Sequence, residues 1–212
     1  MAKTAEAGEV AERAELAETP ARGVPVAAPR AWAVLIGGII GLVASVTLTV
    51  EKIKLLADPG YVPSCNLNPV LSCGSVMATP QASALGFPNP LLGVVAFTVV
   101  VVTGVLAVAK VPLPQWYWIG LALGTLVGAG FAHWLIFQSL YRIGALCPYC
   151  MVVWAVTLCL LVVFAALASE QGGIRKNLQY LHRWRWTAAA LWFIALFLLI
   201  FIRFQDYWIT LL

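Results

Sequence analysis

The sequence predicts an all-α integral membrane protein with five transmembrane helices. Of its 212 residues, 62% are hydrophobic and only 10% are charged, whereas a soluble domain carries roughly 25% charged residues. The mean hydropathy is +0.91, and five apolar runs reach the roughly 20 residues that cross a bilayer as a helix. The net charge of +4 is explained by Lys and Arg beside the spans. Nucleic acid is therefore not an expected partner.

The apolar runs predict where the spans and their connections lie. Residues 1–30, rich in Ala and Glu, are expected to form a disordered cytoplasmic tail. Residues 169–186 are expected to form a basic cytoplasmic loop before the last span. The spans are expected at about 31–50, 90–109, 115–139, 145–168 and 187–212.

Small and aromatic residues predict how these helices pack. Glycines let helices approach closely in a membrane, and they gather in the first and third spans. They are Gly37, Gly38 and Gly41 in the first, and Gly120, Gly124, Gly128 and Gly130 in the third. The third span is therefore expected to pack closely at the middle of a bundle. Its opening residues, Trp116, Tyr117 and Trp118, predict an aromatic belt at the membrane interface.

The longest polar segment, residues 51–88, is expected to be a functional loop, because structureless loops of this length are uncommon. Its first charged residues, Glu51, Lys52 and Lys54, predict that the chain enters the headgroup layer there. Later in the loop, residues 72–77 predict a short helix along the membrane surface.

The distribution of Lys and Arg orients the chain. If the spans alternate in direction, nine of these residues lie on one side and four on the other. The nine are Lys3, Arg13, Arg22, Arg30, Lys110, Arg175, Lys176, Arg183 and Arg185; the four are Lys52, Lys54, Arg142 and Arg203. The N-terminus is therefore expected in the cytoplasm. Residues 51–88 and the start of the fourth span are expected on the extracytoplasmic side.

Two polar or reactive residues inside the spans are given structural interpretations. An intramembrane His is by default a functional candidate, but His133 is expected to be a hydrogen-bonded structural residue. Cys159, in the middle of the fourth span, is expected to act as a small buried hydrophobic residue.

Cys147-Pro148-Tyr149-Cys150 combines two thiols with the start of a helix. Pro148 suits a first helical turn, and the exposed N–H groups and helix dipole stabilise a thiolate there. Thiolates attack disulfides, so this position favours exchange. A static bridge is the alternative, but it would close almost no loop and stabilise little.

The second pair, Cys65 and Cys73, lies in the polar loop. By itself such a pair is more often a structural disulfide, but a second pair on the same membrane face favours a relay of electrons. A zinc site built from all four cysteines is a further alternative. Its spacing resembles no standard zinc ribbon, so no metal site is predicted.

A relay of disulfides needs an acceptor for two electrons. The sequence contains no haem, flavin or dinucleotide signature. Because the inner cysteines adjoin the membrane, a lipid-soluble quinone is the expected acceptor.

One ordered combination of residues resembles the bacterial members of the vitamin K epoxide reductase family, over roughly residues 31–168. It consists of Cys65 and Cys73, Thr79, the run Asn89-Pro90-Leu91-Leu92-Gly93, and Cys147-Pro148-Tyr149-Cys150. The resemblance implies a four-helix catalytic core around a quinone, capped by the cysteine loop and its surface helix. It also implies a thiol:quinone oxidoreductase of the bacterial plasma (inner) membrane that supports disulfide-bond formation.

The resemblance assigns a role to each catalytic cysteine. Cys65 would exchange with a protein partner, and Cys73 would pass electrons to Cys147. Cys150 would be the thiolate that faces the quinone.

The resemblance also suggests quinone contacts. Asn89 would hydrogen-bond a quinone oxygen, and Thr79 would lie near the cysteine loop, with helix capping as the alternative for both residues. Trp154 is also expected to contact the quinone; it stands where the vertebrate enzymes have Tyr, so their inhibitor behaviour is not assumed for this chain. Menaquinone, a vitamin K-type quinone, is favoured over ubiquinone.

The partner implied by the resemblance is a separate extracytoplasmic thioredoxin-like protein of the DsbA type. Bacterial relatives with a fifth span often carry a thioredoxin-like domain after it, whereas this sequence ends at Leu212. The DsbB family performs the same reaction with the two cysteine pairs in the opposite order. The alternatives from other classes are a membrane zinc-binding or scaffold protein and a small transporter, which would require more intramembrane charge.

Overall fold

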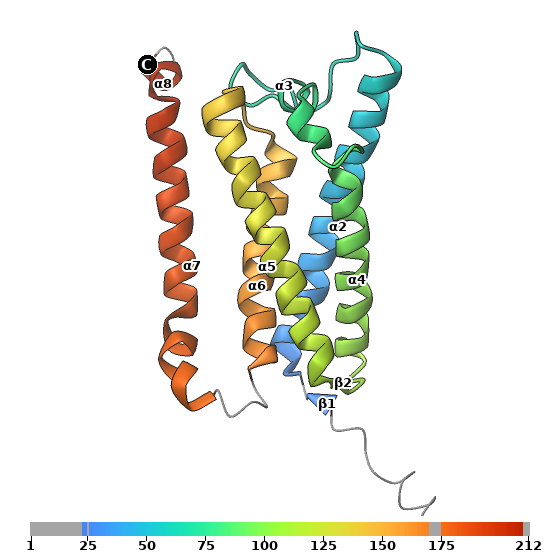
Figure 1. Ribbon diagram of the computed structural model, residues 1–212, viewed down its shortest axis with the longest axis vertical. Helices are drawn as coiled ribbons and strands as arrows, with labels where there is room; N and C mark the ends of the chain where they lie inside the picture. The colour runs from blue at the N-terminus through green and yellow to red at the C-terminus, as the bar shows by residue number, and fades with distance from the viewer. Residues whose placement is uncertain (1–22, 25, 170–174, 210–212) are drawn as a thin grey trace, which may run out of the picture.

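Five long helices run side by side in the computed structural model, which describes residues 23–24, 26–169 and 175–209 (Figure 1). They are α2 (Ala28–Ala57), α4 (Pro90–Val108), α5 (Gln115–Gln138), α6 (Pro148–Ala168) and α7 (Arg175–Arg203). All five contain a stretch that is long and apolar enough to cross a membrane. The predicted all-helical membrane fold is therefore confirmed. Most of the predicted tail, residues 1–22 and 25, lies outside the described residues, as do residues 170–174 and 210–212.

Several helix ends differ from the predicted spans. α2 ends at Ala57 rather than near residue 50, and Glu51 and Lys52 pack inside the protein, each with 6% of its surface exposed. α7 begins at Arg175, so the part of the predicted basic loop after residue 174 is helical.

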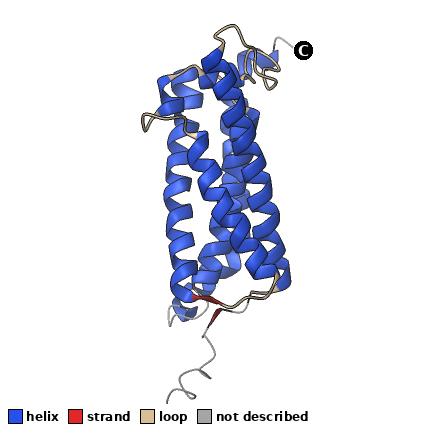
Figure 2. Cartoon of the chain, turned by 90° about the vertical axis from the view of Figure 1, so that its right-hand side faces the viewer, coloured by secondary structure: helices blue, strands red, loops and turns tan. Residues whose placement is uncertain are grey.

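Short elements cap the two ends of the bundle. Between α2 and α4 the loop forms α3 (Cys73–Met77), where a short helix was predicted, and the 3₁₀ helix η1 (Pro80–Ser83). At the opposite end, β1 (Gly23–Val24) pairs antiparallel with β2 (Leu113–Pro114) (Figure 2). A π-helical turn, η2 (Ser139–Ile143), follows α5, and α8 (Gln205–Ile209) follows α7.

Glycines bring α2 and α4 into close contact, as predicted for the first span. A Cβ on Gly41 would collide with the Phe97 ring, and one on Gly104 would collide with the backbone of Leu35. Because any larger residue would force these helices apart, the glycines set their separation.

The glycines of α5 behave differently from the prediction. Within the described chain, a Cβ on Gly120, Gly124 or Gly130 would meet no atom within 4 Å. Gly120 and Gly124 border a cavity instead. Close packing is therefore absent at these three glycines, where no neighbouring helix fills the space, whereas a Cβ on Gly128 would lie in ordinary contact with Thr157 of α6.

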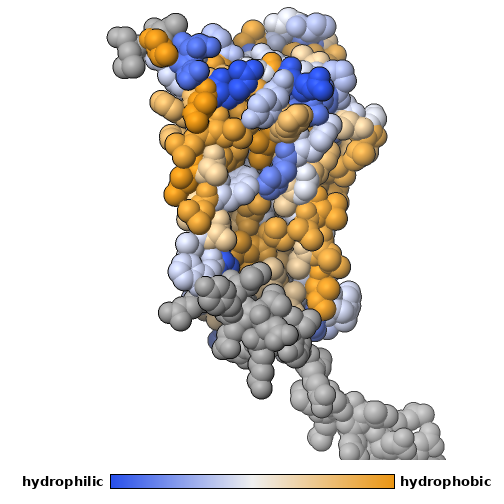
Figure 3. All heavy atoms as spheres, turned by 60° about the vertical axis from the view of Figure 1, so that its left-hand side comes forward, coloured by the Kyte–Doolittle hydropathy of each residue, from blue (hydrophilic) through white to orange (hydrophobic). Residues whose placement is uncertain are grey.

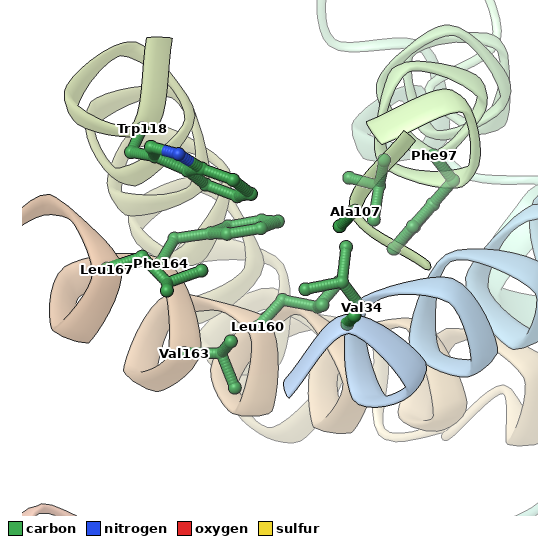
Figure 4. Close-up of a cluster of buried hydrophobic side chains, with 10 residues drawn as sticks. Val34, Phe97, Ala107, Trp118, Leu160, Val163, Phe164 and Leu167 are labelled. Atoms are coloured by element: carbon green, nitrogen blue, oxygen red, sulfur yellow. The ribbon is translucent and has the colours of Figure 1, made fainter. Parts of the chain in front are cut away.

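The half of the bundle distant from the cysteines has a hydrophobic core formed by α2, α4, α5 and α6 (Figure 4). The rings of Trp118 and Phe164 face each other within it, with centroids 6.3 Å apart. Trp118 is fully buried, whereas Trp116 is 72% exposed. The predicted aromatic belt is therefore wrong for Trp118, whose position on the helix turns it inward, and for the exposed Trp116 it stays a prediction.

α7 packs along one side of the bundle. Trp192 contacts His133 of α5 edge-on, with centroids 5.1 Å apart, and His133 Nδ1 lies 2.7 Å from the Ala129 carbonyl oxygen. These contacts fit the structural role expected for His133. On the face drawn in Figure 3, hydrophobic residues cover the length of the helices and hydrophilic residues gather towards one end, as expected for a protein in a bilayer.

Candidate active site

Backbone pairing brings the cysteine loop to the start of α6. The Leu146 N–H donates to the Val70 carbonyl at 2.7 Å, and the Ser72 N–H donates to the Leu146 carbonyl at 2.9 Å. These two bonds form a parallel bridge between Leu71 and Leu146. Cys147 directly follows Leu146, and Cys73 lies two residues after Leu71, so the bridge places the two cysteines side by side.

Local hydrogen bonds explain why α3 begins at Cys73. Ser72 is the N-cap, and its hydroxyl oxygen accepts the Ser75 N–H at 3.2 Å. The Asn66 side chain accepts the Gly74 N–H at 2.8 Å and the Ser72 hydroxyl at 3.2 Å. Polar loop residues therefore supply the partners that the first turn of α3 lacks, and Cys73 is held at the inner face of the loop.

Four sulfur atoms of the two cysteine pairs meet in one region. Cys65 and Cys73 form a disulfide, while Cys147 and Cys150 are free thiols. The Cys147 Sγ atom lies 3.1 Å from the Cys73 Sγ atom. Cys65, Cys73 and Cys147 are all buried, in a cluster that also contains Leu48 and Met77. This arrangement allows thiol–disulfide exchange between the pairs without a large movement of the chain.

Cys147 is the N-cap of α6, and the next residue, Pro148, begins the helix as predicted. The Cys150 N–H points at the Cys147 sulfur, 3.5 Å away. A hydrogen bond from the Cys150 side chain lowers the pKa of Cys147 against the opposing effect of burial, and the N–H groups of Cys150 and Tyr149 lower it further. The helix start therefore favours the thiolate, which is the nucleophile in disulfide exchange.

A cavity of about 790 Å³ lies next to the cysteines, between α2, α4, α5 and α6. This volume is within the roughly 300–1,000 Å³ of small-molecule sites. Its walls are mainly apolar, and a few polar residues gather near the cysteine end. Those at that end include Lys52, Thr79, Gln81, Asn89 and Ser139. A flat, lipid-soluble molecule with polar oxygens fits such a cavity.

All four residues that the sequence suggested as quinone contacts line this cavity: Thr79, Asn89, Cys150 and Trp154. They come from the loop, from the residue before α4, and from the first two turns of α6. Cys150 is the thiol that opens on the cavity, whereas its neighbour Cys147 faces the disulfide.

Asn89 also has a structural task. Its Nδ2 group donates to the Gln81 carbonyl at 2.7 Å, and its Oδ1 atom accepts the Ala84 N–H at 3.1 Å. It makes no side-chain cap to α4, so the capping alternative does not describe it. An amide has two N–H donors, and the second can serve a molecule in the cavity. Thr79 donates its hydroxyl to the Val76 carbonyl at 2.8 Å and likewise makes no side-chain cap.

Two charged residues of the site were missed by the sequence reasoning, which placed Glu51 and Lys52 in the headgroup layer. Glu51 accepts hydrogen bonds from the Tyr61 hydroxyl at 2.9 Å and the Ser64 hydroxyl at 3.1 Å. Lys52 lines the cavity and donates to the Met77 carbonyl at 2.5 Å. A signal was available, because Lys52 lies four residues after Leu48 and three before Leu55, on one helix face.

The zinc alternative finds no support in the geometry. Two of the four cysteines are joined in a disulfide, and thiols bind zinc only as free thiolates. Within the described residues, no group of three or more His, Cys, Asp or Glu side chains is arranged to hold a metal ion.

Comparison with known proteins agrees with this arrangement. The family model described as "Vitamin K epoxide reductase family" matches residues 32–166, which is well over half of the chain. The chain belongs to the vitamin K epoxide reductase family. Members of this family are quinone-linked oxidoreductases, so the protein is an enzyme of the thiol and quinone class. A search among curated proteins found no match.

The match covers nearly all of the four helices around the cavity together with the cysteine loop, and α7 lies entirely outside it. The family assignment therefore rests on the part of the chain that contains both cysteine pairs.

Proposed function

We propose that this protein reoxidises a separate extracytoplasmic thioredoxin-like protein of the DsbA type and passes the electrons to menaquinone in the bacterial plasma membrane. The observation that carries the proposal is the 3.1 Å separation of the Cys147 and Cys73 sulfurs, with Cys150 opening on the cavity. One cysteine pair lies in the loop between α2 and α4, and the other reaches a cavity suited to a quinone.

The reaction proceeds by disulfide exchange followed by reduction of the quinone. A thiolate of the partner attacks Cys65, Cys73 leaves as a thiolate, and the second partner thiol completes the partner's disulfide. Cys73 then attacks Cys147 of an oxidised inner pair, which releases Cys150. Attack of Cys65 on Cys73 restores the loop disulfide and leaves two inner thiols.

The inner dithiol finally reduces the quinone. Two electrons and two protons leave Cys147 and Cys150 as their disulfide forms, and the quinone becomes the quinol. The disulfide between Cys65 and Cys73, with Cys147 and Cys150 free, corresponds to the stage just before this step. Asn89, Thr79 and Trp154 are proposed to contact the quinone, because all three line the cavity beside Cys150.

Access of the partner requires movement of the loop. Cys65 is only 5% exposed, and the hydrogen bonds from Tyr61 and Ser64 to Glu51 hold the segment before it against α2. The proposed orientation places this loop outside the cytoplasm, on the basis of nine Lys and Arg against four.

The proposal is tested with Cys150→Ala and the control Cys159→Ala. Cys159 is a free thiol on the same helix, and it does not line the cavity. Purified protein is supplied with a reduced DsbA-type donor and menaquinone, and quinol formation is followed. We expect Cys150→Ala to abolish quinol formation and leave the donor reduced, and Cys159→Ala to match the wild type. Full activity of Cys150→Ala would refute the relay.

A further inference from the structure

Lys52 is a buried cation beside the cavity, and the proposed relay of cysteines gives it no task. Its side chain is 6% exposed and lines the cavity wall. Lysines are almost never buried to this extent without a partner, because removing an ammonium group from water is costly. In a membrane protein such a residue marks a functional position by default.

The position of Lys52 on α2 directs it towards the cysteines. Leu48 and Leu55, four residues before and three residues after it, share its face of the helix. Both leucines pack in the cluster that contains Cys73, Cys147 and Cys150. Lys52 is therefore on the side of α2 that faces the redox groups, at the cysteine end of the cavity.

The hydrogen bonds of Lys52 leave donors available. Its Nζ atom donates to the Met77 carbonyl at 2.5 Å, and an ammonium group has two further N–H donors. The carboxylate of the preceding residue, Glu51, bonds instead to Tyr61 and Ser64. Among the described residues, no ion pair joins Lys52 to a carboxylate.

The hydrogen bonds that stabilise the Cys147 thiolate come from groups other than Lys52. The pKa of Cys147 is lowered by hydrogen bonds from the Cys150 side chain and from the N–H groups of Cys150 and Tyr149, and Lys52 Nζ donates its hydrogen bond to the Met77 carbonyl rather than to a sulfur. A buried positive charge that is matched by neither a carboxylate nor a thiolate can act on an anion that forms in the cavity.

We infer that Lys52 is a further catalytic residue: its ammonium group binds an oxygen of the quinone ring and stabilises the negative charge that develops there during reduction. This inference rests on the proposed function. The electron pair comes from Cys147 and Cys150 as they form their disulfide, one proton of the quinol comes from the Cys150 thiol and the other is the proton that Cys147 released to water on becoming a thiolate, and Lys52 ends the reaction with its proton. A fixed cation in an apolar site stabilises such a charge far more strongly than water does.

A purely structural role is the competing explanation. Met77 is the last residue of α3, and Lys52 satisfies one of the carbonyl groups that a helix end leaves without partners. Lys52→Gln tests this, because Gln keeps a hydrogen-bond donor and loses the charge, while Lys52→Arg keeps the charge. The matched control is Lys54→Gln, since Lys54 is exposed on the same helix and its Nζ atom lies 5.4 Å from the centroid of the Tyr61 ring.

Two quinones of similar size distinguish charge from shape. The compound 2-hydroxy-1,4-naphthoquinone is an anion at neutral pH, and 2-methyl-1,4-naphthoquinone is neutral. Binding of each to the purified full-length protein is measured by quenching of Trp fluorescence, and turnover is measured with the neutral quinone. Reduction of the loop disulfide by dithiothreitol reports whether the cysteine loop remains intact.

We expect Lys52→Gln to weaken binding of the anion by about 10- to 100-fold, the range of a charge-assisted hydrogen bond. Binding of the neutral quinone should change by less than about threefold. The kcat for the neutral quinone should fall, while the rate at which dithiothreitol reduces the loop disulfide should stay unchanged. Lys52→Arg should restore binding of the anion, and Lys54→Gln should match the wild type.

Equal affinity of the wild type and Lys52→Gln for the anion would overturn the inference. So would equal weakening for both quinones together with faster loop reduction, which would indicate a structural role. Because binding of the anion is read without turnover, the inference is separable from the proposed function, which fails if the wild type forms no quinol.

Discussion

Replacing Asn89 by Ala should damage both a turn and the quinone site. The change removes the bond from Nδ2 to the Gln81 carbonyl, 2.7 Å long, and the bond from the Ala84 N–H to Oδ1, 3.1 Å long. Each is worth about 0.5–1.5 kcal/mol. Because Asn89 is only half-buried, we expect a loss of about 1–2 kcal/mol in stability, or about 2–8 °C in the melting temperature.

The same substitution removes the second amide N–H, which is proposed to donate to the quinone. Loss of one such bond should raise the KM for quinone by about 2- to 10-fold. Thermal unfolding of the purified protein gives the first quantity, and quinone reduction at saturating donor gives the second.

Asn68→Ala is a suitable control for this experiment. Like Asn89, Asn68 makes two side-chain hydrogen bonds to the backbone: its Oδ1 atom accepts the N–H groups of Val70 at 3.0 Å and Leu71 at 2.7 Å. Unlike Asn89, Asn68 does not line the cavity. It should lower the melting temperature to a similar extent and leave the KM for quinone unchanged. If Asn89→Ala left KM unchanged, or if both variants raised it equally, the proposed contact between Asn89 and the quinone would be wrong.

Three further predictions concern the cysteines. Glu51→Gln should speed reduction of the loop disulfide by a soluble thiol by about tenfold, because it weakens the charge-assisted bonds from Tyr61 and Ser64. Rapid-quench alkylation measures the rate of reduction. A rate no higher than that of the wild type would contradict this prediction. The exchange rate of Cys147 should reach half its maximum at a pH below that of an ordinary thiol, because its pKa is lowered, and Cys150→Ala should move this point upward. For the same reason, the stability that the Cys147 thiolate contributes to the reduced protein should be present above the pKa of the thiol in the unfolded chain. It should be lost as the pH falls through the lowered pKa of the folded protein. If the pH dependence of the exchange rate were unchanged in Cys150→Ala, the hydrogen bond from Cys150 would not be the cause of the lowered pKa.

The fold could be predicted because the signals for it are local. The length and apolar character of each run determine whether it crosses a membrane as a helix. The start of α6 at Pro148 and the short helix α3 likewise depend on residues within one turn. These features needed no knowledge of which helices are neighbours.

The packing within the bundle could not be predicted from composition. The glycines of α2 and of α5 look alike in the sequence, yet Gly41 lies against the Phe97 ring and Gly124 faces open space. Trp116 and Trp118 differ in burial because the helix turns them in opposite directions. The difference in each case comes from the neighbouring helix, which a local pattern does not contain.

For the site, the sequence by itself determined the chemistry: two cysteine pairs, the start of a helix beside one of them, and the lipid environment that points to a quinone. Only the tertiary structure decided that Cys73 and Cys147 lie 3.1 Å apart and that Lys52 is a buried cation beside the cavity. The physical reason is that both depend on contacts between distant segments. The pairing of Leu71 with Leu146 and the packing of α2 against the cysteine cluster exist only once the chain has folded.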